Sequence, residues 1–249
     1  MPEININGLK TNYQVFGEGA PFLILHGWGS ASERWEKFAE LIAAKGFKVI
    51  VPDLPGFGKS DQLSHVWTTN DYTNWVEEFI EKIGLQEFYL MGHSFGGALA
   101  CKFAIKYPQK LKKLFLVSSA AVRKHTSKKN AYKFLSKIVK GFAFLPGYDF
   151  FRKAFYKFII VKSDYPYVEG NLKGTFLNVV AEDLSQFTGF IRVPTIIIWG
   201  DKDTYTPISD AYFLNEKIKN SKLIVLKGFG HIVNRDCPEI LSEKVLENI

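Results

Sequence analysis

The feature that most constrains this chain is a serine on a short glycine-flanked turn between a predicted strand and a predicted helix. An apolar run, Phe88 to Met91, leads into the turn Gly92–Gly96, which reads Gly-His-Ser-Phe-Gly, and a helical pattern from Ala98 to Tyr107 follows. A serine on so sharp a turn needs a strained backbone, and glycines on either side let strand and helix pass closely because they have no Cβ atom. The turn therefore predicts that the Ser94 hydroxyl is lifted clear of the sheet, where a base can reach it.

Three more apolar stretches end in turns that carry glycine together with histidine or aspartate. They are Phe22–Leu25 before His26–Gly29, Thr195–Trp199 before Gly200–Asp203, and Lys222–Leu226 before Gly228–His231. In open parallel sheets, functional groups gather just beyond the carboxyl ends of the strands. We therefore expect these turns to meet the serine turn at one edge of a sheet. Along the chain, the serine comes before the aspartate turn, and the aspartate turn comes before the histidine turn.

Apolar stretches of strand length alternate with helical patterns along most of the chain. After a hairpin predicted around Ile4 to Phe16, the expected strands are Phe22–Leu25, Lys48–Pro52, Phe88–Met91, Leu111–Val117, Thr195–Trp199 and Lys222–Leu226. The expected helices are Ser32–Ala44, Tyr72–Ile83, Ala98–Tyr107, Ile208–Lys219 and Pro238–Glu247. This alternation predicts an α/β fold in which helices flank both faces of a mostly parallel central sheet.

One long insertion, residues 120–192, interrupts this rhythm. We predict a core domain from residues 1–119 and 193–249, with residues 120–192 inserted after the sixth strand. The stretch from Arg123 to Lys173 contains 12 Lys and Arg residues against 3 Asp and Glu, a net charge of +9. Because the whole chain carries +7, the rest of it sums to −2. The basic character of the protein is therefore concentrated in the insertion.

The serine turn, with the later aspartate and histidine, resembles the motifs of α/β-hydrolase-fold enzymes, and the resemblance spans nearly the whole chain. It implies an α/β-hydrolase fold whose insertion forms a helical cap over the active site. It also implies a catalytic triad of Ser94 as nucleophile, His231 as base and Asp203 as acid. The backbone N–H groups of Trp28 and Phe95 match the oxyanion hole of the family.

Other residues compete for the acid and base roles. Asp201 precedes Asp203 by two positions, but the family spacing of glycine, two residues and aspartate favours Asp203. The sequence contains four further histidines, which are His26, His65, His93 and His125. Two of them lie inside the glycine-rich turns, where an imidazole more often braces a loop by hydrogen bonding than reacts, and the other two lie in polar stretches. His231 alone follows the last predicted strand.

Two stretches of the insertion place aromatic and lysine side chains at helical spacing. They predict amphipathic helices over residues 132–142 and 151–159. We expect the apolar faces to form an acyl-binding wall, in which Phe155 and Phe158 contact the substrate together with Gly27. The lysines are solvated in one interpretation, and in another they dock on an acidic carrier protein or an anionic surface. We expect no nucleic-acid partner, because no nucleic-acid-binding fold accompanies the charge.

The serine nucleophile argues against the haloalkane dehalogenase and epoxide hydrolase branches, which attack with aspartate. Our main prediction is a carboxylesterase that cleaves small to medium acyl esters through an acyl-enzyme. The turns His26–Gly29 and Asp53–Gly58 resemble those of pimeloyl-carrier-protein methyl esterases. His93 and Phe95 depart from that likeness. Carbon–carbon bond hydrolases of the meta-cleavage type are the alternative, and they carry an arginine near the end of the cap, where only Arg192 lies here. A ligand receptor on the same fold is the non-enzymatic alternative.

The sequence contains no apolar run of 18 residues, and its start lacks a secretory signal pattern. We therefore expect a cytoplasmic protein without a transmembrane segment. The two cysteines, Cys101 and Cys237, have no companions at metal-ligand spacing and are expected to be reduced. We expect neither a metal nor another cofactor, and a small-molecule ester as the substrate.

Overall fold

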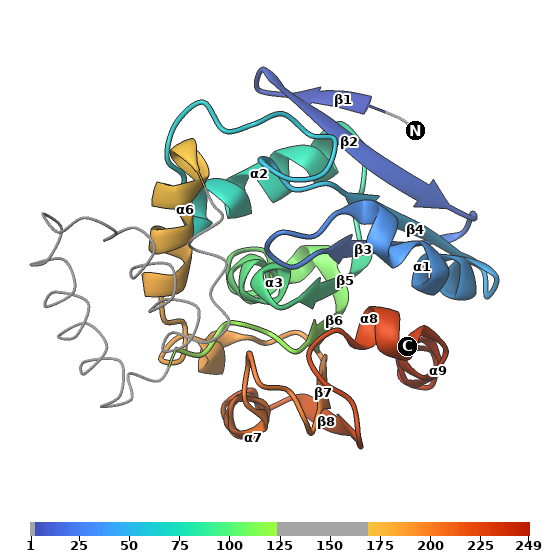
Figure 1. The fold of residues 1–249 in the computed structure, drawn as a ribbon. Coiled ribbons are helices and arrows are strands. Elements are labelled where there is room, and N and C mark those ends of the chain that lie inside the picture. Colours follow the sequence, from blue (N-terminus) through green and yellow to red (C-terminus); the bar gives the residue numbers. More distant parts are fainter. Residues whose placement is uncertain (1–2, 124–168) are drawn as a thin grey trace, which may run out of the picture.

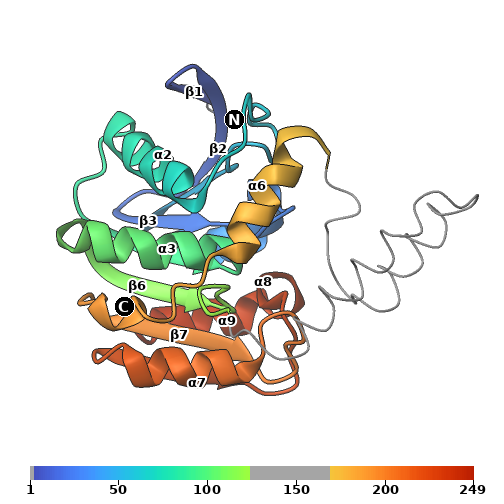
Figure 2. The same cartoon turned by 90° about the vertical axis from the view of Figure 1, so that its left-hand side faces the viewer.

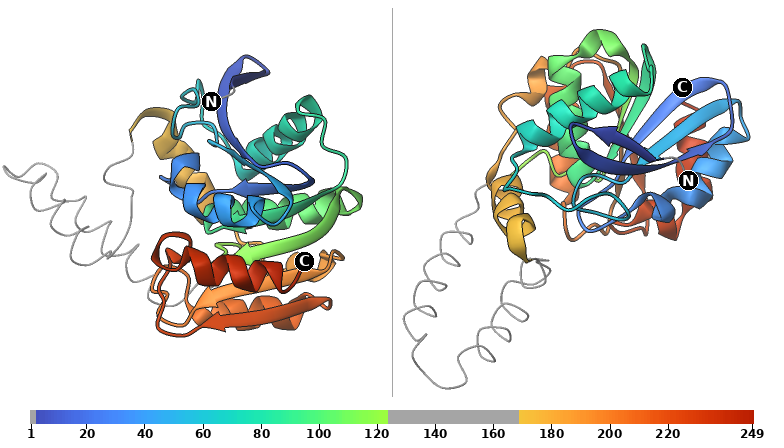
Figure 3. Two further views of the ribbon diagram at one scale, coloured as in Figure 1. Left: turned by 90° about the vertical axis from the view of Figure 1, so that its right-hand side faces the viewer. Right: turned by 90° about the horizontal axis from the view of Figure 1, so that it is seen from above.

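The computed structural model describes residues 3–123 and 169–249, in which helices cover both faces of one twisted sheet (Figure 1). The strands are β1 (Glu3–Ile6), β2 (Leu9–Phe16), β3 (Ala20–Leu25), β4 (Phe47–Pro52), β5 (Phe88–His93), β6 (Leu111–Val117), β7 (Thr195–Gly200) and β8 (Ser221–Leu226). Their order in the sheet is β1-β2-β4-β3-β5-β6-β7-β8. The β1–β2 and β2–β4 pairs are antiparallel, and all the other neighbours are parallel. The hairpin of β1 and β2, dark blue in Figure 3, forms one edge of the sheet. Strand β8 forms the other edge.

The helices divide into two groups according to the face of the sheet that they cover (Figure 2). The longer helices are α1 (Glu36–Ala43), α2 (Thr69–Lys82), α3 (Phe95–Lys106), α6 (Gly170–Ala181), α7 (Ile208–Lys217) and α9 (Pro238–Leu246). The short ones are η1 (Ser32–Trp35), η2 (Pro108–Lys110), η4 (Thr188–Phe190) and α8 (Val233–Asp236). Side chains of α2, α3 and α7 belong to one hydrophobic cluster, and those of α1 and α9 belong to the other.

Strand β3 shows why both faces of the sheet need cover. Leu23 and Leu25 point to the cluster with α2 and α3, whereas Phe22 and Ile24 point to the cluster with α1 and α9. Successive side chains of a strand alternate between faces, so an unbroken apolar run is stable only between two helical layers. All four side chains are fully buried, and burial of each stabilises the fold by about 1.5–3 kcal/mol. The predicted fold class is therefore confirmed for the core.

Of the predicted insertion, the structure describes residues 120–123 and 169–192. Helix α6 lies in this part and is tied to the loop before α2. The Trp67 backbone N–H donates to the Thr175 hydroxyl at 2.8 Å, and the Asn178 amide donates to the Trp67 carbonyl at 3.0 Å. The helices predicted over residues 132–142 and 151–159, with Phe155 and Phe158, lie outside the described residues. The division into core and cap therefore stays a prediction.

Candidate active site

The serine turn has the strained geometry that its sequence predicts. Strand β5 ends at His93, helix α3 begins at Phe95, and Ser94 between them has φ 53° and ψ −115°. A positive φ in a residue with a side chain costs about 1–3 kcal/mol, and the surrounding structure must hold it in place. A Cβ atom on Gly92 would collide with the Gly96 carbonyl. The glycines are therefore required for the close approach of strand and helix.

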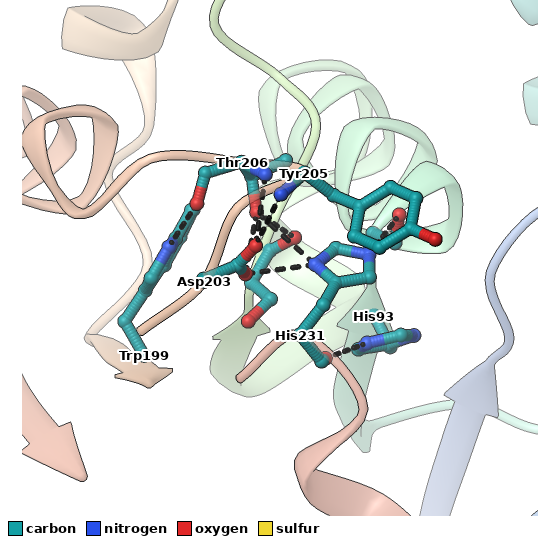
Figure 4. A network of polar contacts seen from close by, with 8 residues as sticks. His93, Trp199, Asp203, Tyr205, Thr206 and His231 are labelled. Carbon is teal, nitrogen blue, oxygen red and sulfur yellow. Dashed lines mark hydrogen bonds and ion pairs between the residues drawn. The ribbon is translucent and has the colours of Figure 1, made fainter. Parts of the chain in front are cut away.

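Ser94, His231 and Asp203 form an unbroken hydrogen-bonded line. Figure 4 shows the part of it between His231 and Asp203. His231 Nε2 lies 2.9 Å from Ser94 Oγ, and His231 Nδ1 lies 2.7 Å from Asp203 Oδ2. A carboxylate can only accept, so the Nδ1–H donates to Asp203, and the bare Nε2 accepts from the serine hydroxyl. The imidazole is thus in the tautomer that can take a proton from Ser94.

The Asp203 carboxylate is held from several directions. Its Oδ1 accepts the backbone N–H groups of Tyr205 and Thr206 at 2.8 and 2.9 Å, and the Thr206 hydroxyl donates to its Oδ2 at 2.8 Å. Burial raises the pKa of Asp203, but hydrogen bonds from His231 and Thr206 outweigh this effect and hold the pKa below its ordinary value. The Trp199 indole fixes the same loop by donating to the Thr206 carbonyl at 2.8 Å. Asp203 is therefore fixed in position and kept charged.

The two histidines of the glycine-rich turns are buried braces. His26 Nδ1–H donates to the Gly27 carbonyl at 2.8 Å, and its Nε2 accepts the Leu54 N–H at 2.9 Å. His93 Nε2–H donates to the backbone carbonyl of His231 at 2.9 Å. Burial lowers the pKa of His26, and burial lowers the pKa of His93 to about 3 with a further contribution from His231. Both rings are therefore neutral at ordinary pH.

The two predicted oxyanion donors lie beside the serine. Phe95 follows Ser94 directly, and a Cβ atom built on Gly27 would lie 3.2 Å from Ser94 Cβ, so the loop that carries Trp28 passes against the serine. Asp53 fixes this loop by accepting the Ser32 N–H at 2.6 Å. Neither the Trp28 N–H nor the Phe95 N–H has an acceptor among the described residues. Both are therefore available to a substrate oxygen.

The Trp28 indole forms an aromatic wall next to the serine. Its ring centroid lies 4.8 Å from that of Phe57, 5.4 Å from Phe95 and 5.2 Å from Phe176, all in edge-to-face geometry. Phe176 belongs to α6, so the wall joins the core to a helix of the predicted cap region. Sequence reasoning missed Phe176, because nothing in the pattern of α6 identifies which of its apolar residues reaches Trp28.

Asp201 and His65, two of the remaining candidates, are exposed residues without a contact to the triad. Asp201 is exposed, and its carboxylate accepts the Gly228 N–H at 2.7 Å, which makes it a turn residue. His65 is exposed, and His125 lies outside the described residues. Cys101 and Cys237 are both buried and free of disulfides. In residues 3–123 and 169–249, no group of three metal-ligating side chains is present, and no helix is long and apolar enough to cross a membrane.

Sequence reasoning also missed Thr206, which contacts every part of the acid site. Its hydroxyl lies 3.2 Å from the Ser118 carbonyl, at the end of β6, and 3.3 Å from His231 Nδ1. An aspartate side chain often closes a local turn by accepting hydrogen bonds from groups two or three positions later in the chain. That spacing was the available signal.

Comparisons with known proteins place the chain in a family and show which proteins it resembles. The sequence pattern of the family described as alpha/beta hydrolase fold matches residues 20–154 and 171–236. Lipase 3 of Moraxella sp. is 26% identical over 86% of this chain and 72% of its own length. A 2-hydroxy-6-oxononadienedioate/2-hydroxy-6-oxononatrienedioate hydrolase of Pseudomonas putida is 26% identical over 96% of this chain and 91% of its own. The structure of a thermophilic esterase from Thermogutta terrifontis superimposes with a TM-score of 0.77 at 22% identity, over 99% of this chain and 97% of that one. That structural likeness concerns the fold alone.

Proposed function

The chain belongs to the α/β-hydrolase-fold family, and from that premise we propose that it is a carboxylesterase of small to medium acyl esters. The observation that carries the proposal is the line of contacts from Asp203 through both nitrogens of His231 to the Ser94 hydroxyl. A hydroxyl is a weak nucleophile until a base removes its proton, and this line places the base within reach. Two free backbone N–H groups next to the serine add the means to stabilise an oxyanion.

Acylation follows from these positions. Ser94 Oγ attacks the ester carbonyl carbon while its proton passes to His231 Nε2, and Asp203 stabilises the imidazolium that forms. The carbonyl oxygen becomes negative and accepts hydrogen bonds from the N–H groups of Trp28 and Phe95. Collapse of this intermediate breaks the bond to the alcohol oxygen, which leaves with the proton from His231. The acyl group stays on Ser94.

Deacylation repeats the same steps with water. His231 Nε2 takes a proton from a water molecule as its oxygen attacks the acyl carbon, and the same two N–H groups hold the second oxyanion. The Ser94 oxygen then leaves and regains its proton from His231. No proton is gained or lost by the enzyme over the cycle, because each half-reaction returns the imidazole to its neutral form.

A carbon–carbon bond hydrolase of the meta-cleavage type is the second candidate, because the Pseudomonas putida relative matches nearly the whole chain. The substrates in the name of that relative are dioates, whose negative charge calls for a cationic partner. Arg192 is exposed and precedes β7, whereas Asp203 follows the carboxyl end of that strand. A strand of 6 residues spans about 20 Å, so Arg192 lies far from the triad. This placement makes Arg192 unsuited to hold the charged end of such a substrate next to Ser94.

The experiment that tests the proposal compares p-nitrophenyl esters of graded acyl length with a vinylogous 1,5-diketone. We expect turnover of the esters, and labelling by a fluorophosphonate at the peptide that contains Ser94. Ser94→Ala should lower kcat by about 10³- to 10⁶-fold. Ser119→Ala is the matched control, because Ser119 is also buried and lies against Gly97 at the start of α3.

Three results would decide against a carboxylesterase. Faster cleavage of the diketone than of every ester would favour the second candidate. Labelling at a residue other than Ser94 would remove the assigned nucleophile. Tight binding of esters without turnover or labelling would indicate a ligand receptor on the same fold.

A further inference from the structure

His231 lies on a loop, so its backbone needs a support of its own. The residue follows β8 and precedes α8, outside any strand or helix. Its imidazole is fixed by Asp203 on one side, but a side-chain contact leaves the Cα position free to shift. The His93 Nε2–H supports the backbone of His231 directly by donating to its carbonyl at 2.9 Å, whereas the neighbouring carbonyls of Phe229 and Ile232 accept backbone N–H groups. Figure 4 shows this contact on the side of His231 away from Thr206 and Asp203.

Two consecutive residues of the serine turn, His93 and Ser94, therefore form hydrogen bonds with His231. Ser94 contacts the imidazole of His231 at 2.9 Å, and His93 contacts its backbone carbonyl at 2.9 Å. The turn that presents them is rigid: the Ser94 N–H donates to the Val117 carbonyl at 3.0 Å, and β5 is paired on both sides. The distance between nucleophile and base therefore depends on the serine turn as well as on Asp203 and on the loop after β8.

The chemistry of His93 suits a brace that takes no part in proton transfer. Its ring is buried, packs 5.8 Å from the Trp35 ring, and lies 4.9 Å from the His231 ring. The ionisable groups around it are His231, Asp203 and His26, and burial keeps His93 neutral beside them. Because a carbonyl can only accept, the single proton of the neutral ring must be on Nε2. His93 therefore offers a fixed donor while His231 gains and loses its proton.

We propose that His93 is a positioning residue, which holds the backbone of His231 so that its Nε2 stays within hydrogen-bond reach of Ser94. This inference rests on the proposed serine-hydrolase function. A misplacement of a catalytic group by about 1 Å can cost about 10²-fold in rate. Loss of the His93 donor should therefore reduce catalysis more than substrate binding, because His93 is buried and contacts the backbone of the base.

Two substitutions separate this role from simple packing. His93→Leu fills the buried space without a donor, whereas His93→Gln can place an amide N–H near the position of Nε2. We expect His93→Leu to lower kcat by about 10- to 100-fold with KM within about 2-fold. The rate of labelling by a fluorophosphonate should fall by the same factor, because that reaction also needs the base next to the serine. His93→Gln should recover most of both rates, and His65→Leu, at an exposed histidine, should change neither.

A spectroscopic measurement on the unaltered protein covers the case in which a variant does not fold. Long-range ¹H–¹⁵N spectra distinguish the two neutral tautomers of histidine, and we expect His93 to carry its proton on Nε2 throughout the pH range in which the protein is folded and active. A proton on Nδ1, or a charged ring in that range, would overturn the proposal. So would a His93→Leu variant with unchanged kcat, or a His93→Gln variant no better than His93→Leu.

The same experiments distinguish failure of this inference from failure of the proposed function. If the unaltered protein is labelled at Ser94 but His93→Leu keeps its full rate, the brace is wrong and the hydrolase stands. If the unaltered protein neither labels nor turns over esters, the proposed function is wrong, and the tautomer spectrum still reports whether the His93 contact exists.

Discussion

At the scale of single residues, Asp203 serves the site because its carboxylate only accepts hydrogen bonds, which an amide of the same shape cannot do. Oδ1 accepts two backbone N–H groups, and Oδ2 faces the Thr206 hydroxyl and His231 Nδ1, so every group around the carboxylate can donate to it. An amide in its place would have to direct an N–H group at one of these donors. If that group faces His231, Nδ1 must accept, and the ring proton moves to Nε2. His231 would then present a donor to Ser94 and could not act as a base.

We predict on this basis that Asp203→Asn lowers kcat by about 10⁴-fold. Asp201→Asn is the control, because that carboxylate is exposed and only accepts the Gly228 N–H. It should cost less than about 10-fold. Steady-state kinetics on a p-nitrophenyl ester, with circular dichroism to check folding, measures both. A larger loss from Asp201→Asn would exchange the roles assigned to the two aspartates.

The buried neutral histidines predict a pH dependence of stability. In the unfolded chain His93 takes up a proton below about pH 6.5, whereas in the folded protein its pKa is about 3. The unfolded state therefore binds more protons between these values, and the free energy of unfolding falls as the pH drops from about 6.5 towards 3. The slope for one such group reaches about 1.4 kcal/mol per pH unit. His26 contributes in the same direction, since burial lowers its pKa as well.

Urea unfolding between about pH 7 and pH 4.5 measures this slope above most of the range in which carboxylates titrate. We predict that the free energy of unfolding of His93→Gln changes less steeply with pH than that of the unaltered protein. The slope should be smaller by up to about 1.4 kcal/mol per pH unit, the value for one proton. Parallel curves for the two proteins would show that His93 does not take up a proton on unfolding in this range, and would contradict the assignment of a buried neutral ring.

At the scale of elements, α6 is a fixed wall rather than a free flap. Helix α6 is hydrogen-bonded to the loop before α2. Glu182, the residue just after α6, also pairs its carboxylate with Lys102 of α3 at 2.6 Å. These ties hold Phe176 against Trp28, next to the oxyanion loop. We expect a wall anchored in this way to limit the room for an acyl group on Ser94.

We predict that Phe176→Ala enlarges the acyl site and shifts the preference of kcat/KM towards longer acyl chains. Each methylene in an apolar pocket is worth about 1–3 kcal/mol, so the ratio of a long to a short p-nitrophenyl ester should rise by about 10-fold or more. Leu177→Ala is the control on the same helix, because Leu177 is 48% exposed. Identical chain-length profiles for the two variants would place the acyl site elsewhere.

Local sequence signals predict the sheet and the triad but not every boundary. The strands from β3 to β8 are predictable because each contains a short apolar run that ends in a turn, and three of these turns carry Ser94, Asp203 and His231. Helix α2 was predicted to begin at Tyr72, but it begins at Thr69. A capping box explains the difference: the Thr68 hydroxyl accepts the Asp71 N–H, and Asp71 accepts the Thr68 N–H.

The supports of the site were less predictable, because their partners are distant and carry no signal of their own. His93 donates to a backbone carbonyl 138 positions later in the chain, and any residue there would offer the same acceptor. Phe176 meets Trp28 only through the placement of α6, which depends on tertiary contacts rather than on helical periodicity. The predicted substrate contacts Phe155 and Phe158 lie outside the described residues and stay predictions.

At the scale of the whole molecule, charge is divided between the insertion and the core. The stretch from Arg123 to Lys173 carries a net charge of +9, whereas the whole chain carries +7. The residues outside this stretch therefore sum to −2 and are slightly acidic. A cluster of one sign raises the rate at which an oppositely charged partner arrives, by about 10- to 10³-fold at low salt. The same cluster does nothing for a small neutral ester. The two interpretations of the basic insertion, a solvated face and a docking surface for an acidic carrier, therefore differ in which substrate the charge affects.

Reversal of three lysines separates these interpretations. The lysines of the insertion to be changed to Glu are Lys133, Lys137 and Lys157. The control makes the same change in net charge at three exposed lysines of the core, which are Lys45, Lys82 and Lys219. If the insertion docks an acidic carrier, its reversal should lower kcat/KM for a carrier-linked ester by about 10-fold at low salt, and leave a p-nitrophenyl ester unchanged. The difference should vanish at about 1 M salt, where the Debye length is only about 3 Å.

The core reversal should have a much smaller effect, since it changes the total charge but not the cluster. Equal effects of the two reversals, or none from the first, would leave the lysines as a solvated face, because docking requires the position of the charge to matter and not only its sum.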